Sequence, residues 1–81
     1  MNALIVDDDS NIVDIIIRSL NWKNLGIEKV LYAYEIAGAK KILTEEPIDI
    51  VVCDIEMPMG SGLDLIQWAR EKGFGSEFLY L

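Results

Sequence analysis

The stretch DIVVCDIEMPMGSGLDLI, residues 49–66, decides the fold of this chain. It begins inside an apolar and β-branched run, residues 48–53, and such a run is typical of a strand buried on both faces. Asp54 ends the run, and the proline and glycines of residues 57–62 predict a loop. Residues 63–71 then have helical spacing, so the stretch indicates one strand–loop–helix unit of a parallel sheet. The residues expected to face inward from this helix are Leu63, Ile66 and Trp68.

The same alternation of strand and helix extends over the whole chain. Strands are predicted at residues 3–6, 29–33, 48–53 and 77–81, and helices at residues 10–20, 36–45 and 63–71. Strands that alternate with helices imply an α/β fold, in which a parallel sheet carries helices on both faces. Ser10 is the expected N-cap of the first helix. The inward stripe predicted for this helix consists of Ile12, Ile15, Ile16 and Leu20.

Composition limits the classes of function open to this chain. Its 81 residues suffice for one small domain, and 14 acidic against 7 basic residues give a net charge of −7. This balance disfavours direct binding of this segment to nucleic acid phosphates. Cys53 is the single cysteine, which excludes an internal disulfide and fits a reducing cytoplasm. No apolar run reaches the roughly 20 residues of a membrane span, so no membrane partner is expected.

The last predicted strand ends in the apolar residues FLYL, 78–81, with no helix after it. We therefore expect residues 1–81 to be the N-terminal part of a longer domain. A strand at the sheet edge with unpaired backbone groups invites another chain. The expectation is a homodimer, through this edge or through a swapped element, unless the chain frays after Gly75 and stays monomeric.

Three aspartates are expected to meet at one edge of the sheet. Asp7 and Asp8 follow the first strand, and Asp54 follows the third. Ligands of open parallel sheets lie beyond the carboxyl ends of the strands. Converging carboxylates need a cation, and oxygen ligands alone favour a hard one such as Mg²⁺. A lone aspartate after a strand is more often a helix cap or turn residue, and Asp9 fits that description.

Two other functions remain open from the residues alone. Asp7 and Asp9 form the D-x-D pattern of a phosphatase of the haloacid-dehalogenase type, with Asp7 as nucleophile. That fold needs further loops, a lysine and later acids. The second alternative is a pure interaction module that works without phosphorylation.

Two stretches, LIVDDD at residues 4–9 and DIVVCDIEMPMGSGLDLI at residues 49–66, resemble the receiver domain of two-component response regulators. The strand–helix order agrees over the whole chain. The loop NWKNLGIE, residues 21–28, further resembles a subgroup whose receivers precede an arabinose-regulator-type helix-turn-helix domain. The resemblance implies a flavodoxin-like sheet of full order 2-1-3-4-5, here truncated in or after its fourth strand. It also implies a missing output domain that regulates transcription.

The resemblance also implies residue roles. Asp54 is expected to accept a phosphoryl group from the histidine of a sensor kinase. Asp7 and Asp8 would position Mg²⁺, with Asp8 as the direct ligand, and Glu56 would add its backbone carbonyl. Receivers also use a Ser or Thr at the end of the fourth strand and a Lys at the end of the fifth, and neither is present in this sequence.

A kinase-docking patch is expected on the first helix. If the inward stripe is the one given above, Val13 and Ile17 lie four residues apart on another face. Exposed apolar residues on such a face suggest a partner. The alternative is that both pack against a later helix of the fold.

Overall fold

The computed structural model describes residues 1–58 and 60–81, so Met59 of the predicted loop lies outside the described residues. Strands and helices alternate along the chain, as expected. The elements are β1 (Asn2–Val6), α1 (Ser10–Ser19), β2 (Lys29–Ala33), α2 (Ile36–Glu45), β3 (Ile50–Cys53), β4 (Glu56–Met57), β5 (Gly60–Ser61), α3 (Gly62–Glu71) and β6 (Glu77–Tyr80). The short pair β4 and β5 was not predicted, and it turns the loop after Asp54 into an antiparallel hairpin.

The main sheet is parallel and has the strand order β2-β1-β3-β6. This order confirms the predicted one, because β6 is the fourth strand of this sheet. In the register, Val6 lies beside Ala33 on one side and beside Cys53 on the other. The carboxyl ends of β1, β2 and β3 therefore finish level with one another, and the residues that follow them share one edge of the sheet.

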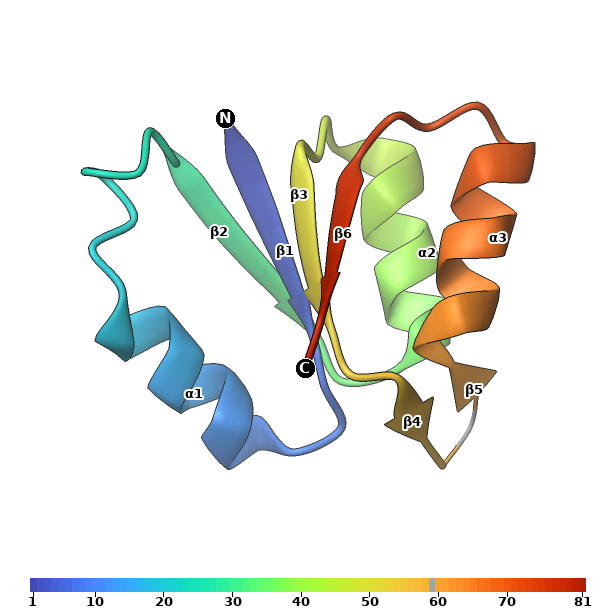
Figure 1. Cartoon of the computed structure of the whole chain (residues 1–81), viewed down its shortest axis with the longest axis horizontal. Coiled ribbons are helices and arrows are strands. Elements are labelled where there is room, and N and C mark those ends of the chain that lie inside the picture. The colour runs from blue at the N-terminus through green and yellow to red at the C-terminus, as the bar shows by residue number, and fades with distance from the viewer. Residues whose placement is uncertain (59) are drawn as a thin grey trace.

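Helices cover both faces of this sheet, but unequally (Figure 1). The helices α2 and α3 lie together on one face, and α1 lies alone on the other. The main core lies under α2 and α3, where alternate residues of the central strands meet the helices. Its buried members are Leu4, Val6, Ala33, Ile36, Ala39, Leu43, Ile48, Val51, Cys53 and Leu65.

The inward face of α1 differs from the predicted one. Val13 is the buried residue of this helix, at 2% exposure, whereas Ile15 is 60% exposed and Leu20 47%. Five of the ten residues of this helix are apolar and form a broad stripe, so spacing alone could not select the part of it that packs. The cap is also different, because the side chain of Asp9 accepts a hydrogen bond from the Asn11 amide and Ser10 is already helical. Because Val13 is buried, it cannot belong to an exposed docking patch.

The inward face of α3 was also predicted wrongly. Leu65 and Ala69 are fully buried, whereas Leu63 is 53% exposed. Helical spacing from Gly62, where the helix starts, places these two residues on the sheet. Trp68 lies at the border of the core, where it meets Phe74 edge-on with ring centroids 5.6 Å apart. Within residues 1–58 and 60–81, none of the helices has the length and apolar character needed to cross a membrane.

Candidate metal centre

The three predicted aspartates do meet at the carboxyl edge of the sheet. Asp7, Asp8 and Asp54 each offer a carboxylate oxygen, and these atoms all lie within 4.8 Å of one another. The backbone explains this convergence. The Asp54 amide donates to the Val6 carbonyl at 3.0 Å, and the Asp7 amide donates to the Ala33 carbonyl at 3.2 Å. The sheet ladder thus continues one residue past the strands and fixes both acidic segments.

Asp7 is the buried member of this acidic cluster, at 3% exposure. Its Oδ1 accepts a hydrogen bond from the Asp9 amide at 2.9 Å, which favours the charged form. Burial acts in the opposite direction and more strongly, and the neighbouring charges of Asp54, Asp8 and Asp9 add to it. Together they raise the pKa of Asp7 above its ordinary value. A group in this position gains most from a nearby cation.

Asp8 and Asp54 are more accessible. Asp8 is exposed, and Asp54 is half-buried at the end of β3. The Glu56 amide donates to Oδ1 of Asp54 at 3.3 Å, so the turn after β3 orients this carboxylate. Glu56 itself is exposed and begins β4. Asp54 therefore combines a fixed orientation with access from solvent, which a reacting carboxylate needs.

The donor set of this cluster fits a hard divalent cation. All its side-chain donors are carboxylate oxygens, which Mg²⁺ prefers, and one oxygen of each lies within 4.8 Å of the others, close enough to converge on one ion. None of the ion pairs found in the described part of the chain involves Asp7, Asp8 or Asp54. A bound cation would supply the counter-charge that these carboxylates lack.

Gly62 is a residue of this site whose role the sequence did not reveal. Its φ is not positive, so glycine is not required here for a left-handed turn. Gly62 matters because its backbone lies very close to that of Asp54. A Cβ at this position would lie 2.4 Å from the Asp54 carbonyl oxygen and 2.9 Å from Sγ of Cys53. Only glycine lets α3 start directly against the backbone of Asp54.

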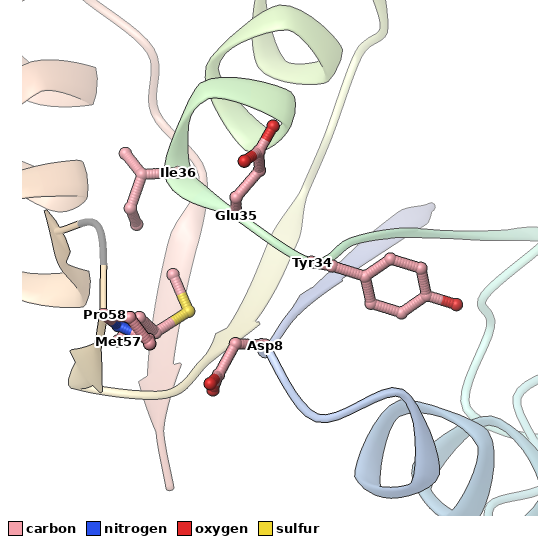
Figure 2. A pocket seen from close by; sticks show the side chains of 6 residues that line it. All are labelled: Asp8, Tyr34, Glu35, Ile36, Met57 and Pro58. Atoms are coloured by element: carbon pink, nitrogen blue, oxygen red, sulfur yellow. The ribbon is translucent and has the colours of Figure 1, made fainter.

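A small cavity of about 120 Å³ opens beside the cluster. Figure 2 shows Asp8 across this cavity from Met57 and Pro58, with Glu35 and Ile36 at the start of α2 on a third side. The ring of Tyr34 points away from it. The cavity leaves room for a small chemical group beside the carboxylate of Asp8.

Val13 and Ile17, the residues predicted for kinase docking, lie on α1 and do not form an exposed pair. Val13 is buried, as described above, and Ile17 is half-buried. The carbonyl of Ile17 accepts a hydrogen bond from Nε1 of Trp22 at 2.9 Å, which fixes the loop after α1. The apolar residues that α1 does expose include Ile12 and Ile15, and Leu20 at its C-cap is exposed as well.

Comparison with known proteins gives a consistent result. The sequence profile described as the response regulator receiver domain matches residues 3–78. The chain is 34% identical over 70 residues to the response regulator protein PilR of Pseudomonas aeruginosa, covering 86% of this chain and 15% of PilR. It is 33% identical over 80 residues to the response regulator SaeR of Staphylococcus epidermidis, covering 99% of this chain and 33% of SaeR.

A solved structure is similar over nearly the whole chain. The two-component transcriptional regulator AraC from Clostridium phytofermentans superposes with a TM-score of 0.93 at 25% identity, covering 99% of this chain and 62% of that one. The chain thus spans a third or less of these two curated relatives, and about two thirds of the similar structure.

Proposed function

This chain belongs to the response regulator receiver family, and on that premise we propose that it accepts a phosphoryl group from a sensor histidine kinase onto Asp54. One observation carries the proposal. Asp54 is the half-buried carboxylate of the acidic cluster whose Oδ1 is held by a backbone amide, that of Glu56. The acceptor of a transfer reaction must be both oriented and accessible.

The transfer itself is a substitution at phosphorus. A carboxylate oxygen of Asp54 attacks the phosphorus atom, the bond from phosphorus to the kinase's histidine nitrogen breaks, and an acyl phosphate forms. The electron pair of the broken bond stays on the imidazole, which takes up a proton from solvent. A carboxylate is a weak nucleophile, so positioning and charge neutralisation supply most of the catalysis.

Mg²⁺ is the proposed cofactor of this step. Asp8, Asp54 and the backbone carbonyl of Glu56 would hold it, with Asp7 close by. When bound, the ion neutralises negative charge on the transferring group. Support comes from the oxygen-only donor set and from the buried carboxylate of Asp7, whose pKa is raised mainly by burial, with the charges of Asp54, Asp8 and Asp9 adding to it.

The same observations disfavour Asp7 as a phosphatase nucleophile. At 3% exposure its carboxylate is much less accessible than that of Asp54, and its raised pKa makes the charged form costlier. Membership of the receiver family also favours Asp54 as the reacting group. The three converging carboxylates also favour a phosphoacceptor over an interaction module that works without phosphorylation.

The whole protein is proposed to be a cytoplasmic transcription regulator. The similar structure from Clostridium phytofermentans is described as a two-component transcriptional regulator, and this supports an output domain of that kind. A free, buried Cys53 fits a reducing compartment. Phosphorylation of Asp54 would add charge beside the hairpin of β4 and β5, and that charge would bias the surface read by the output domain.

A homodimer through β6 is also proposed. This strand lies at one edge of the sheet, and Leu79 and Leu81 are 53% and 63% exposed. They share an apolar cavity of about 490 Å³ with Ile15 and Ile16 of α1 and with Leu20, the residue that follows this helix. Light scattering over a concentration series tests the dimer: rising mass supports it, and a constant mass of 9.1 kDa contradicts it.

The phosphoacceptor function is tested by labelling the chain with a phosphorylated sensor kinase or with a small phosphodonor, with Mg²⁺ or with a chelator. The expected product carries one phosphoryl group, forms only with Mg²⁺, and is cleaved by hydroxylamine, as acyl phosphates are. A label that survives hydroxylamine would indicate a phosphoester on a hydroxyl group and would contradict the proposal.

A further inference from the structure

Tyr80 connects the last strand of the sheet to the segment behind the acidic cluster. Its hydroxyl donates a hydrogen bond to the Gly62 carbonyl at 3.1 Å, joining the end of β6 to the start of α3. In the register of the sheet Tyr80 lies beside Cys53, the residue that precedes Asp54. The pKa of Tyr80 is raised, mainly by burial, so the hydroxyl keeps its proton and acts as a donor. The function described above does not use this contact.

Gly62 is the residue that closes the loop after Asp54. Its amide donates to the Ile55 carbonyl at 2.8 Å, so the two ends of the segment 55–62 are joined. Its α-carbon lies against the Asp54 backbone so closely that a side chain has no room. A displacement of Gly62 would therefore move Ile55 and the Asp54 carbonyl.

The same loop holds the carboxylate of Asp54. Glu56 pairs with Ser61 in the β4–β5 hairpin, directly before Gly62. The Glu56 amide donates to Oδ1 of Asp54. Contacts therefore run without interruption from the Tyr80 hydroxyl through Gly62 and the hairpin to the reacting carboxylate.

We propose that Tyr80 is a positioning residue for phosphoryl transfer: through Gly62 its hydroxyl holds Ile55 and Glu56 in the arrangement that orients Asp54 and presents the Glu56 carbonyl. This inference rests on the proposed role of Asp54 as acceptor. The simpler role for Tyr80 is structural, in which its hydroxyl only satisfies its own hydrogen bond and the ring fills the core beside Phe78. The two roles differ in what a Tyr80→Phe substitution does to the reaction.

The test compares the parent chain with Tyr80→Phe, which keeps the ring and removes the hydroxyl. Tyr32→Phe is the matched control, because Tyr32 is 49% exposed on the opposite edge strand β2. Initial rates of Asp54 labelling are measured against phosphoramidate concentration at saturating Mg²⁺, well below each variant's unfolding midpoint. The Glu56 and Gly62 amide resonances are recorded on the same ¹⁵N-labelled samples.

A positioning role predicts a lower maximal rate for Tyr80→Phe, by about fivefold, which is the rate equivalent of one ordinary hydrogen bond. The half-saturating donor concentration should stay unchanged, since the hydroxyl does not touch the donor. The Glu56 amide resonance should shift in Tyr80→Phe, and Tyr32→Phe should match the parent in rate and spectrum.

A purely structural role predicts a lower unfolding midpoint alone. If Tyr80→Phe keeps the parental maximal rate and the parental Glu56 resonance, the inference is overturned while the acceptor role of Asp54 stands. If the parent chain itself takes no phosphate at Asp54, the proposed function fails and this inference fails with it. The two failures are therefore distinguished by the parent sample.

Discussion

The amide of Asp54 donates a hydrogen bond to the carbonyl oxygen of Val6 at 3.0 Å, one residue beyond the paired ends of β3 and β1. This bond fixes Asp54 beside the residues that follow Val6, which are Asp7 and Asp8. The acidic cluster is therefore a consequence of strand register, and it forms before any ligand is bound. Its electrostatic cost falls mainly on Asp7, the buried member.

That cost predicts that Asp7→Asn stabilises the metal-free chain at neutral pH. The folded pKa of Asp7 lies above 3.8, so the folded state binds this proton more tightly than the unfolded state. The stabilisation that Asp7 gives the folded state by binding this proton is therefore fully present below pH 3.8, and it is lost as the pH rises through the pKa of Asp7 in the folded chain. Asparagine removes the charge and still accepts from the Asp9 amide.

Denaturant unfolding of both chains in chelator at pH 7 measures this difference. We expect Asp7→Asn to be more stable by on the order of 1 kcal/mol, a typical size for a single substitution. Equal or lower stability of Asp7→Asn would show that its hydrogen bond outweighs burial and repulsion.

Mg²⁺ should raise the unfolding midpoint of the parent chain, because the ion binds only the folded state. At 100 times its dissociation constant, the expected gain is roughly 2.7 kcal/mol. Asp8→Ala should lose most of this gain. Glu28→Ala is the control, since it removes one negative charge at the opposite end of the sheet, where Glu28 is exposed. A similar loss in both variants would indicate a general charge effect and contradict a specific site.

The thiol of Cys53 should be unreactive in the folded chain. It is buried, and burial together with the charges of Asp54 and Asp7 raises its pKa from 9.0 to about 11. The thiolate is the reactive form, so alkylation at pH 8 should follow unfolding of the chain. The raised pKa also means that stability is lost between pH 9 and about 11.

Iodoacetamide labelling read by mass spectrometry checks this prediction. The rate should rise with denaturant in parallel with the unfolded fraction. Rapid labelling without denaturant would show that the segment around Asp54 opens locally.

Gly62→Ala should destabilise the fold and slow phosphorylation together. The added methyl group would meet backbone atoms of Asp54, which cannot move like a flexible side chain. Overpacking of this kind typically costs about 1–3 kcal/mol. Gly75→Ala is the matched control, because nothing lies within 4 Å of a Cβ at that position and its φ is not positive. If both substitutions are equally mild, the close approach of α3 to Asp54 is not rigid.

The sequence was sufficient to predict the sheet and the convergence of the aspartates. Short β-branched runs ending in acid define strand ends, and parallel order then brings Asp7, Asp8 and Asp54 to one edge. The packed faces of α1 and α3 could not be predicted equally well. In α1 the apolar residues form a stripe about half the circumference wide, and the buried Val13 lies toward one edge of it, so spacing alone could not tell which part of the stripe packs.

The contacts of Gly62 and Tyr80 could not be predicted from the sequence for a different reason. The role of Gly62 depends on a backbone approach between segments, and the hydrogen bond from Tyr80 joins residues 18 apart in the chain. Neither leaves a periodic pattern. The hairpin of β4 and β5 consists of two-residue strands, which are too short for any alternation to indicate them.

The most direct test of the account is the intact mass of the chain after incubation with a small phosphodonor and Mg²⁺, for the parent, Asp54→Asn and Asp9→Asn. Asp9 carries a similar charge in the same acidic segment but caps α1, and it is not a member of the cluster. The account predicts one added phosphoryl group on the parent and on Asp9→Asn, and none on Asp54→Asn. Undiminished labelling of Asp54→Asn would contradict the claim that Asp54 is the phosphoacceptor.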